Sequence, residues 1–261
     1  MISGIKLNRN LEFVDPLIMI LNEEIEAAIL KFKDFQTGPI GETPPINIAR
    51  FIDHTLLKPD ATEADIRKLC QEAIQYEFKT VCVNPAWIPL CCEILDLSST
   101  EPIAVVDFPL GASLTTVRTM EAGAAIDAGA KEIDIVIPIG RLRGGDYDYV
   151  FKDIKGVYEA CEGRPLKVIL ETSMLTHNEI VAACVICKEV GVSFVKTSTG
   201  FGGGGATIEH VALMKAVVGE GIEVKASGGI RTYKDAMRML SAGALRIGAS
   251  ASVAIVEEQG E

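Results

Sequence analysis

Four otherwise apolar segments of the sequence each carry an ionisable side chain: Asp134, Lys167, Lys196 and Lys225. Short, continuous apolar runs of this kind are typical of parallel β-strands that are covered on both faces. Successive side chains along a strand point to opposite faces of the sheet. If these four residues point to a common interior, one carboxylate and three ammonium groups meet there.

Such a cluster has a charge problem with a chemical consequence. Burying a charge costs several kcal/mol unless the charge is paired, and one aspartate cannot neutralise three lysines. The surplus charge must be offset by substrate, or one lysine must lose its proton. A desolvated lysine beside other cations has a lowered pKa and can attack a carbonyl carbon as a neutral amine. The pattern predicts Schiff-base chemistry, with Asp134 or a second lysine moving protons.

A simpler interpretation is open for part of this cluster. A lysine at the end of a strand is commonly solvated or ion-paired, and Lys167 stands at the start of its segment. Lys167 fits an ion-pair partner of Asp134 and a substrate contact better than a catalytic group. Asp134, Lys196 and Lys225 lie within their segments, and three such charges on nearby strands favour a catalytic interpretation.

Three glycine-containing segments follow the last three apolar runs. Backbone N–H groups at helix N-termini and in glycine-rich turns bind phosphate without net positive charge. One glycine turn is a weak signal, because turns need glycine anyway. Together they predict a phosphorylated small molecule as ligand. The segments contain the run 202–205 and the predicted site residues Gly200, Gly228, Gly229, Gly248 and Ser250.

The spacing of the apolar runs indicates the elements that carry these residues. Eight runs recur along the chain, each followed by a segment of helix length, and this pattern predicts a closed (β/α)8 TIM barrel of the α/β class. An open doubly wound sheet is the alternative, but the first run is not followed by the GxGxxG typical of dinucleotide-binding sheets. In such barrels the chemistry lies at the carboxyl ends of the strands. The runs centre near Ile52, Val81, Val105, Ile135, Val168, Val195, Val224 and Ile247.

Residues 1–48 differ from this repeat and predict an N-terminal helical extension and linker. Asp15 and Pro16 form a helix-start signal, and apolar residues recur at helical spacing from Ile18 to Phe35. Glycines and prolines between 38 and 45 then form a linker. We expect a docked helix rather than a second folded domain, with residues 49–261 as the catalytic barrel.

Composition limits the environment and the partners. The 261 residues include 25 basic and 36 acidic side chains, a net charge of −11, which disfavours binding to nucleic acid or an anionic membrane. We find no membrane-spanning run and no signal peptide. The seven cysteines are an odd number scattered through apolar segments, which favours a reducing compartment. The sequence predicts a cytoplasmic protein.

Eight short segments, in order between residues 51 and 250, resemble the 2-deoxyribose-5-phosphate aldolases, a family of class I aldolases. The lysine-bearing pair VKTSTGF and VKASGG is the most specific part of this resemblance. The family fold is a (β/α)8 barrel, in agreement with the spacing. The segments are IDHTLLKPDAT, VCVNP, DFPLGAS, EIDIVIPIG, VILET, VKTSTGF, VKASGGIRT and RIGAS.

The resemblance implies a role for each matched position. It makes Lys196 the Schiff-base lysine, Lys225 the second lysine that lowers its pKa, and Asp134 the acid/base group. It places Cys82 and Asp53 close to substrate, although a buried apolar cysteine and an ion-paired strand residue are equally plausible. It assigns the predicted glycines and Ser250 to phosphate.

The implied reaction is reversible cleavage of 2-deoxy-D-ribose 5-phosphate to acetaldehyde and D-glyceraldehyde 3-phosphate, in deoxyribose phosphate catabolism. The iminium is the electron sink, so no cofactor or metal is expected. Members of the family are often dimers, so we expect a homo-oligomer. One departure is Phe201, which stands where some members carry a phosphate-binding lysine, so phosphate would depend more on backbone N–H groups.

Two other functions stay open. A phosphosugar isomerase on the same barrel would use Asp134 as the proton-transfer base and the lysines only for their charge. A non-catalytic protein could bind a phosphorylated ligand. A metal site is not favoured, because Cys184 and Cys187 lie in an apolar helical pattern, and no two histidines have metal-ligand spacing.

Overall fold

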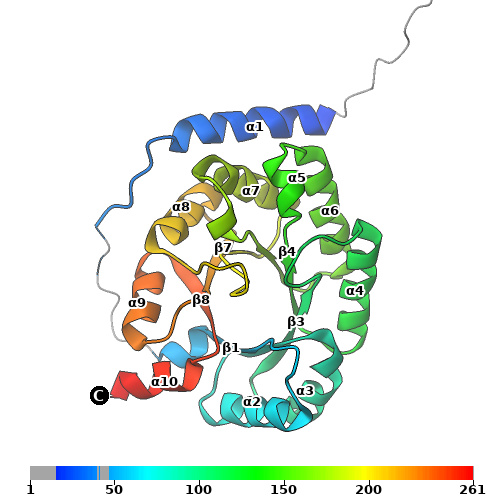
Figure 1. Cartoon of the computed structure of the whole chain (residues 1–261), viewed down its shortest axis with the longest axis vertical. Coiled ribbons are helices and arrows are strands. Elements are labelled where there is room, and N and C mark those ends of the chain that lie inside the picture. The colour runs from blue at the N-terminus through cyan, green and yellow to red at the C-terminus, as the bar shows by residue number, and fades with distance from the viewer. Residues whose placement is uncertain (1–15, 40, 42–46, 261) are drawn as a thin grey trace, which may run out of the picture.

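Eight short parallel strands close into a barrel in the computed structural model, which describes residues 16–39, 41 and 47–260. Each strand pairs with the next along the chain, and the last pairs with the first (Figure 1). This closure confirms the predicted (β/α)8 barrel, and every predicted strand centre lies in a strand. The strands are β1 Ile52–Leu56, β2 Thr80–Val83, β3 Glu101–Val106, β4 Glu132–Val136, β5 Leu166–Ile169, β6 Phe194–Lys196, β7 Glu223–Ser227 and β8 Ala244–Ala249.

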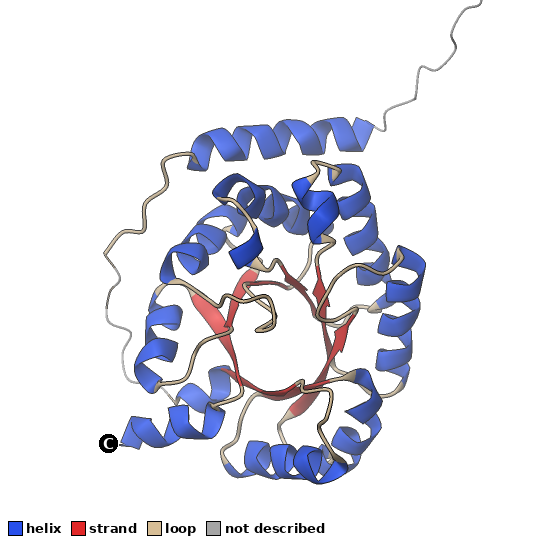
Figure 2. Cartoon of the chain, in the orientation of Figure 1, coloured by secondary structure: helices blue, strands red, loops and turns tan. Residues whose placement is uncertain are grey.

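Helices surround the barrel and cover its outer face (Figure 2). Several of them begin at a threonine whose hydroxyl accepts a backbone N–H of the first turn, as Thr62, Thr176 and Thr232 do. No helix in the described part of the chain is long and apolar enough to cross a membrane. The helices are α1 Pro16–Phe32, α2 Glu63–Gln75, α3 Ile88–Leu95, α4 Thr115–Asp127, α5 Ile139–Arg143, α6 Tyr147–Ala160, α7 His177–Val190, α8 Ile208–Val218, α9 Tyr233–Ser241 and α10 Ser252–Glu257.

The alternation along the strands separates two interiors. In β4, Ile133 and Ile135 belong to the large core between the barrel and its helices, while Glu132 and Asp134 belong to ion pairs inside the barrel. A second, smaller apolar cluster consists of Leu57, Cys82, Ile103 and Val105, with Phe108 packed against it. Both faces of each strand are covered, which is why the strands read as continuous apolar runs.

The register of the barrel brings the interior charges to similar depths. Asp134 is opposite Lys167 on the neighbouring strand, Lys196 is opposite Lys225, and Lys225 is opposite Arg246. Opposite residues on paired strands project to the same face. The predicted meeting of one aspartate and three lysines inside the barrel is therefore confirmed.

Helix α1 lies across the outside of the barrel against α7 (Figure 1). It buries Ile18, Leu21 and Ile25, and its carbonyl at Phe32 lies 2.8 Å from Nε2 of His177. The sequence predicts helical spacing as far as Phe35, but the helix ends at Phe32. A turn follows, in which the Phe35 N–H donates to the Phe32 carbonyl and the rings of Phe32 and Phe35 meet edge to face. The predicted helix start at Asp15 lies outside the described residues.

Candidate active site

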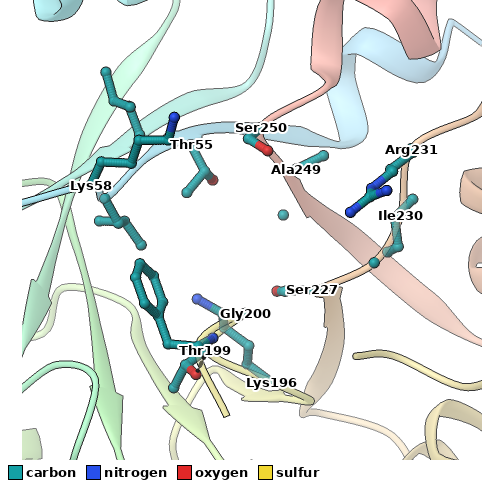
Figure 3. A pocket seen from close by; sticks show the side chains of 16 residues that line it. Thr55, Lys58, Lys196, Thr199, Gly200, Ser227, Ile230, Arg231, Ala249 and Ser250 are labelled. Atoms are coloured by element: carbon teal, nitrogen blue, oxygen red, sulfur yellow. Dashed lines mark hydrogen bonds between the residues drawn. The ribbon is translucent and has the colours of Figure 1, made fainter. Parts of the chain in front are cut away.

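A cavity of about 290 Å³ opens at the carboxyl ends of the strands, where a barrel of this type carries its chemistry. Loops after β1, β6, β7 and β8 form its walls. Lys196 extends into it from one side and Arg231 from another (Figure 3). The lining residues are 55–58, Lys196, 199–201, 227–231 and 248–250.

Lys196 connects the cavity to the charged interior. It is 3% exposed, and its Nζ lies 2.8 Å from Oδ2 of Asp134. Nζ of Lys225 lies 2.8 Å from the same oxygen. Asp134 and Lys225 are fully buried and do not line the cavity. Lys196 is thus the one member of this trio that a ligand in the cavity can touch.

Below the trio the ion pairs continue as a closed network. Lys167 contacts Asp134 at 3.0 Å and also contacts Glu132. On the other side, Asp53 Oδ2 lies 2.5 Å from Nζ of Lys225. Arg246, which lies 3.1 Å from Asp53 and 2.8 Å from Glu132, joins the two halves.

This network corrects the charge count made from the sequence. The count took Asp134 as the sole carboxylate, whereas Asp53 and Glu132 add two more and Arg246 adds a fourth cation. With every group ionised, three negative charges face four positive ones. The cluster becomes neutral when one amine loses its proton. Two features of the sequence could have revealed these extra charges. Glu132 lies two residues before Asp134 and therefore on the same face of β4, and Arg246 lies inside the apolar run of β8.

The surroundings of the two lysines shift their pKa values in opposite directions. Burial lowers the pKa of Lys196, and the charge of Lys225 lowers it further, against the opposing effect of Asp134. Burial also disfavours the charged form of Lys225, but Asp134 and Asp53 outweigh it and raise its pKa. Lys196 is therefore the amine that gives up its proton first.

The two carboxylates stay ionised. Burial would raise the pKa of Asp134, but three lysines outweigh it and hold the pKa well below the usual range. In the same way, the charges of Lys225 and Arg246 overcome burial and lower the pKa of Asp53 to about 2. Thr80 also donates its hydroxyl hydrogen to Asp53 at 2.7 Å.

Three predicted substrate contacts do not reach the cavity. Asp53 and Lys167 are fully buried, and their polar atoms are taken up by the ion pairs. Cys82 is fully buried in the small apolar cluster, where burial raises the pKa of its thiol to about 11. The structure places these residues beneath the site, where they set its charge and shape.

The predicted phosphate residues do line the cavity, on three neighbouring loops. They are Gly200, Gly228, Gly229, Gly248 and Ser250. Close packing requires a glycine at position 248, because a Cβ there would lie 2.8 Å from Oγ of Ser227 and 3.1 Å from Cε of Lys225. A side chain at this position would push against the second lysine.

Three further lining residues set the character of the cavity mouth. Phe201 is 52% exposed, and its ring meets that of Phe108 edge to face, with centroids 5.4 Å apart. Lys58 and Arg231 are exposed cations on the cavity wall. Sequence reasoning did not single out these cations, although both lie in segments that carry the family resemblance.

The cysteines and histidines considered as metal ligands do not line the cavity. Cys184 and Cys187 are fully buried in α7. His54 pairs with Glu72 at 2.9 Å, and His177 contacts α1. Among the residues that the structure describes, no cluster of three or more histidine, cysteine, aspartate or glutamate side chains could hold a metal ion.

Sequence comparisons relate the chain to known aldolases. The deoxyribose-phosphate aldolase of Mannheimia succiniciproducens is 54% identical over 213 residues, which cover 82% of this chain and 95% of that protein. The deoxyribose-phosphate aldolase of Carboxydothermus hydrogenoformans is 53% identical over 214 residues, covering 80% of this chain and 94% of that protein.

Structural comparison agrees over a longer part of the chain. A crystal structure from Coccidioides immitis superposes with a TM-score of 0.86 at 42% identity, covering 92% of this chain and 98% of that one. The tetrameric deoxyribose phosphate aldolase of Aeropyrum pernix superposes with a TM-score of 0.78 at 28% identity, with the same coverage. These relatives favour the aldolase over the isomerase. Because the family model of the DeoC/LacD aldolases matches residues 48–257, the chain belongs to the DeoC/LacD family of aldolases.

Proposed function

We propose that this aldolase cleaves 2-deoxy-D-ribose 5-phosphate reversibly to acetaldehyde and D-glyceraldehyde 3-phosphate through a Schiff base on Lys196. The observation that carries the proposal is the sharing of Asp134 Oδ2 by Lys196 and Lys225, each at 2.8 Å. It puts a permanent cation beside the amine that lines the cavity. The name of the 54% identical Mannheimia enzyme supports the substrate.

The reaction begins with the neutral amine. Lys196 Nζ adds to the C1 aldehyde of the open-chain sugar, and loss of water gives the iminium. A base takes the C3 hydroxyl proton, and the C2–C3 bond breaks as its electron pair moves toward the iminium. D-glyceraldehyde 3-phosphate leaves and an enamine remains. Protonation of the enamine at C2 and hydrolysis release acetaldehyde and free Lys196.

The buried groups below Lys196 handle protons. Asp134 and Lys225 do not line the cavity, so they exchange protons with the reacting atoms through Lys196 or through a water molecule beside it. Lys225 keeps its proton in the resting state because Asp134 and Asp53 raise its pKa. It serves as a charge that keeps Lys196 neutral and as a nearby acid.

The phosphate binds at the glycine-lined wall. Gly200, Gly228, Gly229 and Ser250 offer backbone and hydroxyl donors there, and Arg231 extends into the same space (Figure 3). Since Phe201 stands where some relatives have a lysine, this wall relies on those donors and on the arginine. Asp53, Lys167 and Cys82 act from below without touching the sugar.

We also propose the wider setting. Residues 49–261 form the catalytic unit and residues 1–48 an N-terminal extension, of which helix α1 packs against α7. The enzyme works in the cytoplasm in deoxyribose phosphate breakdown, without a cofactor or metal, and as a homo-oligomer, with a dimer favoured. The tetrameric Aeropyrum relative supports self-association in the family. Analytical ultracentrifugation of the full chain measures the number of subunits.

Chemical trapping tests the proposed reaction. Sodium borohydride added with 2-deoxyribose 5-phosphate should reduce the imine and leave a stable adduct on Lys196, located by peptide mass spectrometry. Lys188, an exposed lysine outside the site on α7, is the internal control and should stay unmodified. An adduct elsewhere, or turnover without any adduct, would reject the Schiff base on Lys196.

A further inference from the structure

Glu171 occupies an unusual backbone position at the rim of the barrel, directly after β5. Leu170 and Thr172 donate their N–H groups to the carbonyls of Lys196 and Thr197, each at 2.9 Å. These two donors alternate along the chain after β5, whereas their acceptors are consecutive residues at the end of β6. Glu171 lies between the two donors, at the point where the chain leaves the sheet and enters a short 3-10 helix. It stands next to the backbone of the lysine that lines the cavity.

The backbone conformation of Glu171 is costly, so its side chain needs a compensating contact. Its φ is +56°, in the left-handed region, which is unfavourable for a non-glycine residue. Its side chain is directed under the β6–α8 loop and the residue is 1% exposed. A buried carboxylate must be satisfied by hydrogen-bond donors.

Those donors come from the start of the β6–α8 loop. Oε2 of Glu171 accepts the backbone N–H of Thr199 at 3.1 Å and also accepts the Thr199 hydroxyl. The same hydroxyl oxygen accepts the N–H of Phe201 at 2.9 Å. Gly200 and Phe201, which line the cavity, are therefore held through Thr199 by a carboxylate that does not line it.

The rest of this loop is packed directly on the same support. A Cβ added at Gly202 would lie 2.5 Å from Cδ of Glu171, and one at Gly204 would lie 2.4 Å from Cβ of Ser173. These glycines allow the loop to approach the β5–α7 loop closely. The glycine run therefore has a packing function in addition to the phosphate-binding function predicted from the sequence.

The loop passes this support on to its other neighbour. The N–H of Ala206 donates to the carbonyl of Gly228 at 3.0 Å, and a Cβ at Gly205 would lie 2.3 Å from the same oxygen. Glu171 thus anchors one end of a contact series whose other end is the glycine pair after β7. Gly200 and Phe201 next to the first end, and Gly228 and Gly229 at the second, line the wall that the phosphate occupies in the proposed function.

We propose that Glu171 is a positioning residue that sets the conformation of residues 199–206, and through it the affinity for the substrate phosphate. The proposal rests on the proposed function for its substrate. Because the carboxylate is buried and engaged with Thr199, it acts through the loop and does not touch the sugar. Its loss should weaken binding of the phosphate more than it slows chemistry at Lys196.

Paired substrates separate this role from a general structural one. Glu171→Ala should raise KM for 2-deoxyribose 5-phosphate by about tenfold or more, with a smaller effect on kcat. For unphosphorylated 2-deoxyribose, kcat/KM should change by less than about threefold. Glu171→Gln keeps an acceptor oxygen for the Thr199 N–H and should fall between Glu171→Ala and the wild type. An equal loss of kcat/KM on both substrates would overturn the proposal.

A second variant and a matched control complete the experiment. Thr199→Val removes the hydroxyl that links Glu171 to the N–H of Phe201. It should lower kcat/KM for the phosphorylated sugar relative to the unphosphorylated one, as Glu171→Ala does. This variant tests the proposal if Glu171→Ala does not fold. Glu223 pairs with Lys215 at the start of β7, at the end of the barrel opposite the cavity. Glu223→Gln removes this carboxylate and should leave the ratio of kcat/KM for the two substrates unchanged.

One readout needs no substrate. Amide hydrogen exchange across residues 199–206 should be faster in Glu171→Ala than in the wild type, and unchanged exchange would overturn the proposal. If borohydride trapping finds no imine on Lys196, the proposed function fails while this exchange result still decides whether Glu171 holds the loop.

Discussion

Lys196 and Lys225 are opposite each other on β6 and β7 and lie 2.8 Å from the same oxygen of Asp134, yet they differ in their second carboxylate. Asp53 contacts Lys225 at 2.5 Å, whereas Lys196 faces the cavity. This asymmetry explains why the pKa of Lys225 is raised and that of Lys196 is lowered. In the proposed mechanism, Asp53 thus helps to decide which lysine becomes the nucleophile.

Removing the second lysine should make the nucleophile harder to deprotonate. In Lys225→Met the positive charge that lowers the pKa of Lys196 is gone, while Asp134, which raises it, remains. The proposed reaction needs neutral Lys196, so the acidic limb of the pH profile of kcat/KM should move to higher pH. Lys215→Met, which removes a lysine paired with Glu223 away from the site, is the control. An acidic limb that stays in place would contradict the coupling.

Replacing the aspartate below the site should affect stability and its pH dependence. Asp53→Asn leaves Lys225 and Arg246 with less buried negative charge, and breaking a buried ion pair typically costs about 3–5 kcal/mol. Urea denaturation at pH 7 measures the loss.

The pKa of Asp53 gives the sign of the pH effect. It is lowered from 3.8 to about 2 on folding, so its stabilisation is present above pH 3.8 and is lost as pH falls toward 2. That shift corresponds to roughly 2 kcal/mol. The stability difference between wild type and Asp53→Asn should narrow over this interval, and a constant difference would contradict this account.

A buried lysine with a lowered pKa should also reduce the free energy of unfolding. Folding disfavours the proton on Lys196, so between its lowered pKa and 10.5 the unfolded chain binds more protons and wild-type stability rises with pH. Lys196→Met removes a buried amine and the surplus charge of the cluster. It should abolish turnover and imine trapping while raising stability near pH 7 by on the order of 1 kcal/mol.

The pH series provides the check on that assignment. In Lys196→Met the rise of stability with pH due to this group should be absent, as followed by thermal unfolding between pH 6 and 10 with Lys188→Met as the control. A variant less stable than the wild type at every pH would indicate that the amine is a net structural partner of Asp134.

The sequence predicts the barrel well because both faces of each parallel strand are buried. The strands therefore appear as continuous apolar runs, and charges such as Asp134 and Lys196 stand out within them. Glu132 does not stand out, because a glutamate at the start of a strand has the same appearance as a solvent-exposed end. Its partner Arg246 lies on β8, and the pairing depends on the closure of the barrel.

The parts of the site that sequence reasoning missed depend on contacts between loops. Glu171 follows its strand and gives no periodic signal, yet its carboxylate accepts the backbone N–H of Thr199. The glycine run indicated a phosphate site but not the close approach of Gly202 to Glu171. Such contacts arise from strand register and loop conformation, which composition and spacing do not determine.

Phe201 offers a direct test of how the phosphate is held. It lines the cavity with its ring against Phe108, and the family resemblance implies that some members have a phosphate-binding lysine at this position. Phe201→Lys adds a cation at the glycine-lined wall, and a charge-assisted hydrogen bond to phosphate contributes about 1.5–3 kcal/mol. KM for 2-deoxyribose 5-phosphate should therefore fall by about tenfold, which corresponds to 1.4 kcal/mol.

The added charge must be separated from the lost aromatic contact. Phe201→Met removes the ring that packs on Phe108 but adds no charge, so its KM for the phosphorylated sugar should stay at or above the wild-type value. The benefit of Phe201→Lys should shrink as salt is raised, because the mouth of the cavity is open to solvent and the interaction is screened. Equal KM values for the lysine and methionine variants at low salt would mean that residue 201 lies beyond reach of the phosphate, and that the backbone donors and Arg231 hold it without help from this position.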